Sequence, residues 1–128
     1  MADIENIDSI KILVDAFYTK VRQDALLGPV FAEVVKDDWQ PHLDKMYAFW
    51  NAALFAVPGF KGNPFARHAP LPIQPQHFSQ WLSLFHKTVD EHFTGPVATD
   101  AKNRAELMSV MFQAKLSRIK DGFNKVIV

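Results

Sequence analysis

The stretch GNPFARHAPLPIQPQHFSQW, Gly62 to Trp81, places four of the eight prolines of the chain around His68. Proline fixes φ and removes a backbone donor, so residues 58–74 are predicted to form an irregular connection rather than a helix. Connections of this length in compact domains are usually functional or disordered, and Phe60, Phe65 and Leu71 argue against disorder. We therefore expect an ordered loop that holds the His68 side chain in one direction.

Before this loop, apolar residues at steps of three and four predict a helix with a buried stripe, capped by Asp8 or Ser9. The helix is expected to stop at Gly28 and Pro29, with Phe31 in a short connector. A second helix is predicted over residues 39–54. The residues on either side of the loop are thus expected to be helical.

Two more helices are predicted after the loop. Pro75 suits the first turn of one of them, and Thr99 or Asp100 is expected to cap the last, which Gly122 closes. No alternating strand pattern occurs in the sequence. The predicted fold class is all-α, with four substantial helices and one ordered loop.

Length and composition predict a single domain over residues 1–128, because domains of this size share one core. Acidic and basic residues balance at 14 each, so no net field favours nucleic acid or an anionic membrane surface. The amino terminus lacks the pattern of a signal peptide, and no apolar run approaches the roughly 18 residues of a membrane span. We expect a cytoplasmic protein with neither nucleic acid nor membrane as a partner.

The sequence lacks the residues and motifs of several classes of metal site and enzyme. It has no cysteine, which excludes disulfides, thiolate ligands and iron–sulfur clusters. It has five histidines but no HExxH motif, and it has neither a phosphate-binding glycine loop nor a GxSxG elbow. Zinc hydrolysis, nucleotide hydrolysis and esterase chemistry are therefore not expected.

His68 differs from the other histidines because stiff backbone surrounds it. A single neutral imidazole held in one direction, an apolar slot and the absence of cysteine are what a haem iron needs from its protein. Arg67, next to it, could pair with a haem propionate. The alternatives are a His68 hydrogen-bonded within its loop and a solvated Arg67.

Three further polar side chains lie on predicted helices: Tyr18, His42 and Trp81. The tyrosine and the tryptophan fall on apolar stripes, and each has a polar hydrogen that needs a partner when buried. The alternative for all three is a core or rim residue with a satisfied hydrogen bond. Spacing alone does not bring them together.

Seven segments taken in order resemble the truncated haemoglobins of group III, a bacterial haem-protein family. They are FYTKVRQD, LGPVF, DDWQPHL, FW, FKGNP, RHAPLPIQPQHFSQWLSLF and TVDEHF, and the resemblance covers about residues 10–116. It implies a truncated two-over-two helical globin fold that binds haem b (iron protoporphyrin IX).

The resemblance also implies roles for single residues. His68 matches the axial iron ligand on the proximal side. Four residues match positions on the side where the small ligand binds: Tyr18, His42, Met46 and Trp81. Three residues match contacts of the cofactor: Phe31, Arg67 and Trp81. Gln80 stands where the family more often has a basic residue for a propionate.

The implied function is binding of oxygen and other small diatomic ligands, such as nitric oxide or carbon monoxide, at a five-coordinate iron. Oxygen transport and redox chemistry on nitric oxide or peroxide both fit this. One alternative is an enzyme, a nitric oxide dioxygenase or peroxidase, which needs a separate reductase because the chain has no flavin or nicotinamide motif. Another is a haem-free helical interaction or sensor module. The sequence leaves open whether His42 coordinates iron in the unliganded state.

Overall fold

The computed structural model describes residues 1–35, 39–58 and 74–127, without the side chains of Val34 and residues 116–127. Its helices are α1 (Ile7–Gln23), α2 (Leu27–Val35), α3 (Trp39–Phe55), α5 (Pro75–His92) and α6 (Pro96–Ile127). No strand occurs in these three ranges, which confirms the predicted all-α class. Most of the predicted loop, with Arg67 and His68, lies outside the described residues.

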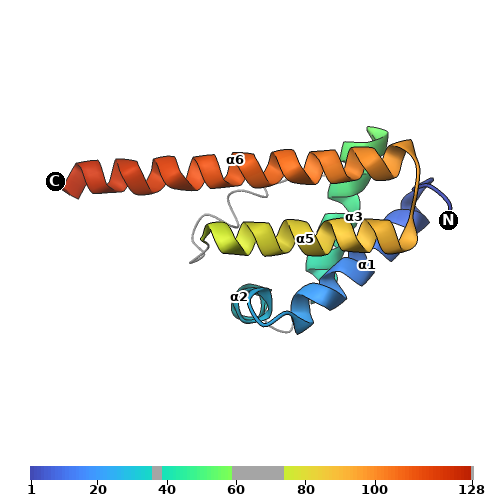
Figure 1. Cartoon of the computed structure of the whole chain (residues 1–128), viewed down its shortest axis with the longest axis horizontal. Coiled ribbons are helices and arrows are strands. Elements are labelled where there is room, and N and C mark those ends of the chain that lie inside the picture. The colour runs from blue at the N-terminus through green and yellow to red at the C-terminus, as the bar shows by residue number, and fades with distance from the viewer. Residues whose placement is uncertain (36–38, 59–73, 128) are drawn as a thin grey trace.

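One pair of helices, α5 and α6, packs along its length, and the other helices gather around α1 (Figure 1). α5 and α6 run side by side in opposite directions, joined by a short connection. α1 packs against α3 and also against α2 and α5, so it lies at the centre of the contacts. The carboxyl-terminal part of α6 extends past the start of α5 (Figure 1).

α1 buries the stripe that its spacing predicts, with Ile10, Leu13 and Val21 fully inaccessible to solvent. Its amino terminus is capped by Asn6, whose side chain accepts a hydrogen bond from Ser9 N at 3.1 Å. The prediction of Asp8 or Ser9 as the cap was therefore wrong by two or three residues. Asn6 satisfies a first-turn N–H that has no partner within the helix.

The residues predicted to stop α1 instead begin another helix, α2, so the placement of Phe31 in a connector was wrong. Pro29 is tolerated because it lies in the first turn, where its missing N–H costs nothing. Gly28 is needed because a Cβ there would lie 2.8 Å from the Arg22 carbonyl oxygen. The glycine and proline thus mark a tight corner between two helices.

α6 begins at Pro96, so the prediction of Thr99 or Asp100 as its cap was wrong. The Asp3 carboxylate, far away in sequence, accepts hydrogen bonds from Val97 N at 2.9 Å and Ala98 N at 2.8 Å. The residues around the start of α6 could not predict this cap, because it comes from the amino terminus of the chain.

Two glycines bear on the limits of α6. Gly95 has φ +138°, and a Cβ there would lie 2.6 Å from Asp3 atoms, so the cap requires glycine before the helix. Gly122 was predicted to close the helix, but the helical backbone continues to Ile127. Glycine inside a helix is tolerated at a cost of roughly 0.5–1 kcal/mol relative to alanine.

Candidate functional site: an aromatic pocket at the centre of the helices

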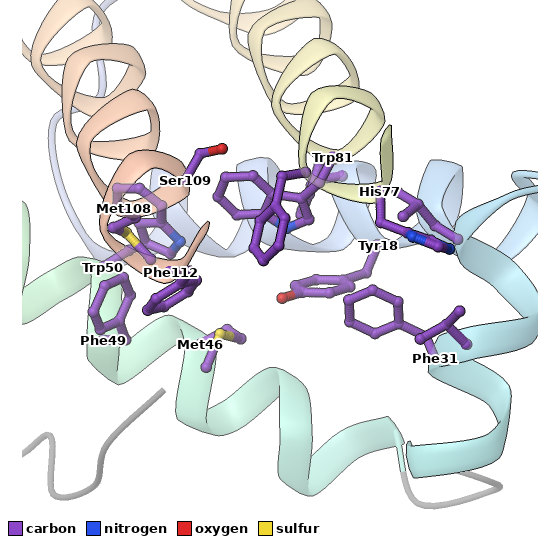
Figure 2. Close-up of a pocket in the computed structure, with 14 residues that line it drawn as sticks. Tyr18, Phe31, Met46, Phe49, Trp50, His77, Trp81, Met108, Ser109 and Phe112 are labelled. Atoms are coloured by element: carbon purple, nitrogen blue, oxygen red, sulfur yellow. The ribbon is translucent and has the colours of Figure 1, made fainter. Parts of the chain in front are cut away.

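All five described helices contribute to one largely apolar pocket (Figure 2). Its described lining consists of Phe17, Tyr18, Leu27, Val30, Phe31, Met46, Phe49, Trp50, His77, Phe78, Trp81, Met108, Ser109 and Phe112. Residues from widely separated positions converge because α1 packs against three neighbours and α6 covers α5. Five of the eleven phenylalanines of the chain line this pocket.

The pocket contains about 710 Å³ of space not filled by atoms, part of it open to solvent. Room for water-sized molecules amounts to only about 50 Å³, so the walls are closely spaced. Close aromatic walls suit a flat apolar ligand better than a spherical one.

Two of the lining rings, Trp81 and Trp50, both stack on Phe85 of the core. Their ring centroids lie 5.7 and 4.9 Å from that of Phe85, with planes within 17° of parallel. Phe17 meets the stack edge on, at 5.6 Å from Trp81 and 5.3 Å from Phe85. Such pairs contribute about 0.5–1.5 kcal/mol each beyond burial, so the direction of the Trp81 ring is set by packing.

Tyr18 brings a polar group into this apolar site. The residue is 7% exposed, and its hydroxyl points into the pocket on the side where Met46 and Phe112 lie (Figure 2). Burial raises the pKa of Tyr18 well above its ordinary value, so the phenol keeps its proton. A neutral phenol can donate a hydrogen bond to a ligand in the pocket.

His42 lies against Tyr18 and is not among the described residues that line the pocket. The two rings meet edge to face, with centroids 4.9 Å apart and planes at 86°. Trp39 packs on His42 at 5.8 Å, also nearly perpendicular. The imidazole is therefore held one layer behind the tyrosine, close enough to influence its position.

His77 lines the pocket, although no sequence pattern singled it out. Its Nδ1 accepts a hydrogen bond from Gln74 N at 3.0 Å, while His77 N donates to the Gln74 carbonyl at 2.9 Å. The first bond assigns the proton of the neutral ring to Nε2. The only available signal was its position one turn before Trp81 on the same helix.

The last helix supplies Met108, Ser109 and Phe112 to the pocket. Met108 and Phe112 lie on the stripe that predicts this helix, so the periodic pattern identified their face but not their role. Ser109 is 4% exposed, and its hydroxyl accepts a hydrogen bond from Gln113 at 3.1 Å. A buried serine within an apolar stripe was the signal that sequence reasoning missed.

Gln80 does not contribute to the pocket among the described residues, although Trp81 follows it directly. Its amide nitrogen donates to Asp24 Oδ1 at 2.7 Å, and Leu26 N and Leu27 N donate to Oδ2. Burial acts to raise the pKa of Asp24, but these three hydrogen bonds outweigh it and lower the pKa below its usual value. The position expected to hold a basic residue thus joins α5 to the corner between α1 and α2.

The structure brings together four of the predicted site residues, which lie on four different helices: Tyr18, Phe31, Met46 and Trp81. His42 lies next to the pocket, and Arg67 and His68 lie outside the described residues. Within the described ranges no cluster of three or more metal-binding side chains occurs. In the same ranges no helix combines the length and apolarity needed to cross a membrane.

Comparison with known proteins identifies the family. A family model described as bacterial-like globin matches residues 4–116. The group 3 truncated haemoglobin ctb of Campylobacter jejuni is 32% identical over 115 residues, which cover 87% of this chain and 91% of the relative.

The fold has a close match among solved structures. The crystal structure of a group III truncated haemoglobin from Campylobacter jejuni matches with a TM-score of 0.84 and 30% identity, over 91% of this chain and 95% of the other. These matches confirm the predicted truncated, two-over-two globin fold. The chain belongs to the bacterial-like globin family, as a truncated haemoglobin of group III.

Proposed function

We propose that this protein is a haem-b globin that binds oxygen and other small diatomic ligands, with His68 as the axial iron ligand. When bound, haem would supply an iron atom that can bind such a ligand. The observation that supports the proposal best is the narrow aromatic pocket with a protonated tyrosine inside it. Membership of a globin family supports the same cofactor.

The residues around the pocket fit such a group. A narrow apolar pocket with a few polar groups is the usual form of a cofactor site. Phe31, Met46 and Trp81 all line this pocket and would contact a flat macrocycle placed in it. This also argues against the haem-free interaction module, which has no need of an internal space.

Tyr18 is the proposed stabilising donor for the small ligand. A ligand that gains partial negative charge is favoured by a hydroxyl directed at it, and such a bond contributes roughly 1.5–3 kcal/mol. Trp81 is the second candidate because its indole N–H can only donate. His42, packed on the tyrosine ring, is proposed to gate access or to approach the iron when no ligand is bound.

The remaining assignments are proposals that rest on the sequence. Arg67 is proposed to pair with a propionate, and the chain is proposed to be a single globin domain in the cytoplasm. Whether the protein turns over nitric oxide or peroxide depends on a separate reductase. Sustained consumption of these substrates with a reductase would indicate an enzyme, and stoichiometric binding alone would indicate a carrier or sensor.

The decisive experiment compares two histidines. Wild-type protein supplied with haem b is expected to give ferric and ferrous spectra of a histidine-ligated haem protein. In His68→Gly the axial bond is lost, and added imidazole restores the wild-type spectrum by taking the place of the missing side chain. His77→Gly is the matched control, because it removes an imidazole that does line the pocket.

Two results would contradict the proposal. In the first, wild-type protein takes up no haem. In the second, His68→Gly keeps the wild-type spectrum while His77→Gly loses it, so that the axial ligand is on α5. Far-ultraviolet circular dichroism of each variant separates loss of ligation from loss of fold.

A further inference from the structure

A second hollow lies between α1 and α3, and its character is opposite to that of the aromatic pocket. Its described lining consists of Asp15, Tyr18, Thr19, Arg22, Trp39, Gln40, Leu43 and Tyr47, and room for water-sized molecules is about 240 Å³. We call it the α1–α3 cleft. The same measure gives about 50 Å³ for the aromatic pocket, so the cleft has much more room for water-sized molecules.

Two interactions join α1 and α3 beside the cleft. On one side the Tyr47 hydroxyl donates to Asp15, which joins α1 to α3. On the other side the Arg22 guanidinium lies 4.6 Å from the centre of the Trp39 ring. Asp15, Arg22 and Gln40 are exposed, so the cleft is in contact with solvent.

Among the described residues, Tyr18 is the one that lines both the cleft and the aromatic pocket. Its neighbours in sequence divide between the two spaces, because Phe17 lines the pocket and Thr19 the cleft. The Tyr18 side chain therefore borders both the solvent-accessible cleft and the apolar pocket. The ring is held by edge contacts to Phe31 at 6.0 Å and His42 at 4.9 Å, and small motions of those partners would move it.

We propose that the α1–α3 cleft is an access and exit path for the small ligand, which passes between Tyr18 and Leu43 to reach the pocket. The inference rests on the proposed function, because it concerns the ligand that the haem would bind. Leu43 lines the cleft and is partly buried against the core, so its side chain is placed to narrow the passage. Rotamer changes that open such a passage take place in picoseconds to microseconds.

A path residue has a kinetic signature that a binding residue lacks. A barrier on a path is crossed in both directions, so changing its height changes the association and dissociation rates by the same factor. The equilibrium constant then stays the same. A residue that contacts the bound ligand acts mainly on dissociation and changes the affinity.

The test measures carbon monoxide association by flash photolysis and dissociation by ligand replacement, on ferrous haem-loaded protein. Leu43→Trp fills the cleft and is expected to slow both rates by roughly fivefold or more, while Leu43→Ala speeds both. Thr19→Phe narrows the cleft from α1 at an exposed position and covers the case in which Leu43→Trp does not fold. Lys45→Trp adds the same bulk to an exposed site on α3 that lines neither space, and both rates should match those of the wild type.

The outcomes distinguish the path from the function. If wild-type protein takes up no haem, the proposed function fails and the path fails with it. If haem binds but Leu43→Trp and Thr19→Phe leave both rates within about twofold of the wild type, the path is overturned. If His42→Trp is then the one variant that slows both rates, the access route runs past His42 instead. A change in dissociation only, with altered affinity, would also overturn the path, because it would make Leu43 a contact of the bound ligand.

Discussion

The side chain of Gln80 donates a hydrogen bond to Asp24 at 2.7 Å across 56 positions of sequence, and the next residue is Trp81. Asp24 also accepts from the backbone at the start of α2. One carboxylate therefore fixes three helices relative to one another at the edge of the pocket. Trp81, the residue that follows Gln80, lines the pocket and stacks on Phe85.

Removing the donor tests this link. Gln80→Leu is expected to lower the free energy of unfolding by about 0.5–1.5 kcal/mol, the usual net contribution of one hydrogen bond. Urea denaturation measures the loss. Gln76→Leu, on an exposed residue of the same helix, is the control and should change stability by less than about 0.5 kcal/mol. Equal effects in both variants would show that the bond to Asp24 contributes nothing.

The pH dependence of stability follows from Asp24. Its hydrogen bonds hold the folded pKa below the unfolded value of about 3.9, so the stabilisation is complete above that pH. It is lost as pH falls through the lower folded value, because the protonated acid accepts these bonds less well. Asp24→Ala should be about 1 kcal/mol less stable than the wild type at pH 7, and the difference should shrink below pH ~3.9. Thermal unfolding at several pH values checks this, and a difference that stays constant would contradict it.

Gly95→Ala is expected to destabilise the protein by about 1–3 kcal/mol, since an alanine would hold an unfavourable positive φ. The added methyl would also clash with the Asp3 carboxylate that caps α6. A double-mutant cycle with Asp3→Ala separates the two causes, because without the carboxylate only the backbone strain remains. Additive effects in the cycle would show that the close contact carries no energy.

Tyr18→Phe removes only the hydroxyl from the pocket. If that group donates to the ligand, oxygen dissociation should accelerate about tenfold or more, equivalent to a lost bond of about 1.4 kcal/mol. Stopped-flow mixing with carbon monoxide measures the rate. A dissociation rate within about twofold of the wild type would assign the role to Trp81 or His42. Trp81→Phe, which keeps an aromatic ring but removes the N–H, is the matched comparison.

The sequence was sufficient where local patterns decide the structure. The stripes of α1, α3 and α5 follow apolar spacing, and Pro75 begins α5 as expected. α2 was missed because Gly28 and Pro29 are common both in turns and in the first turn of a helix, and only the close approach to Arg22 distinguishes the two. The start of α6 was missed because its cap is Asp3, which no local window contains.

The candidate site, too, could be predicted from the sequence only in part. Periodicity placed Tyr18, Met46 and Trp81 on buried faces, and the family resemblance supplied their roles. It could not show that they share one pocket, since that depends on how α1 crosses its neighbours. Neither source indicated His77, whose place at the pocket follows from the hydrogen bond with Gln74 at the start of α5.

The Asp3 cap also affects how the molecule opens. Asp3 binds the first turn of α6, and Ala2 accepts a further bond from Thr94 N at 3.0 Å. α6 in turn carries Met108 and Phe112 to the pocket. Fraying of the first few residues would therefore loosen a wall of the pocket that those residues do not line. Amide hydrogen exchange should show the amino terminus and the first turn of α6 opening together, as one cooperative unit.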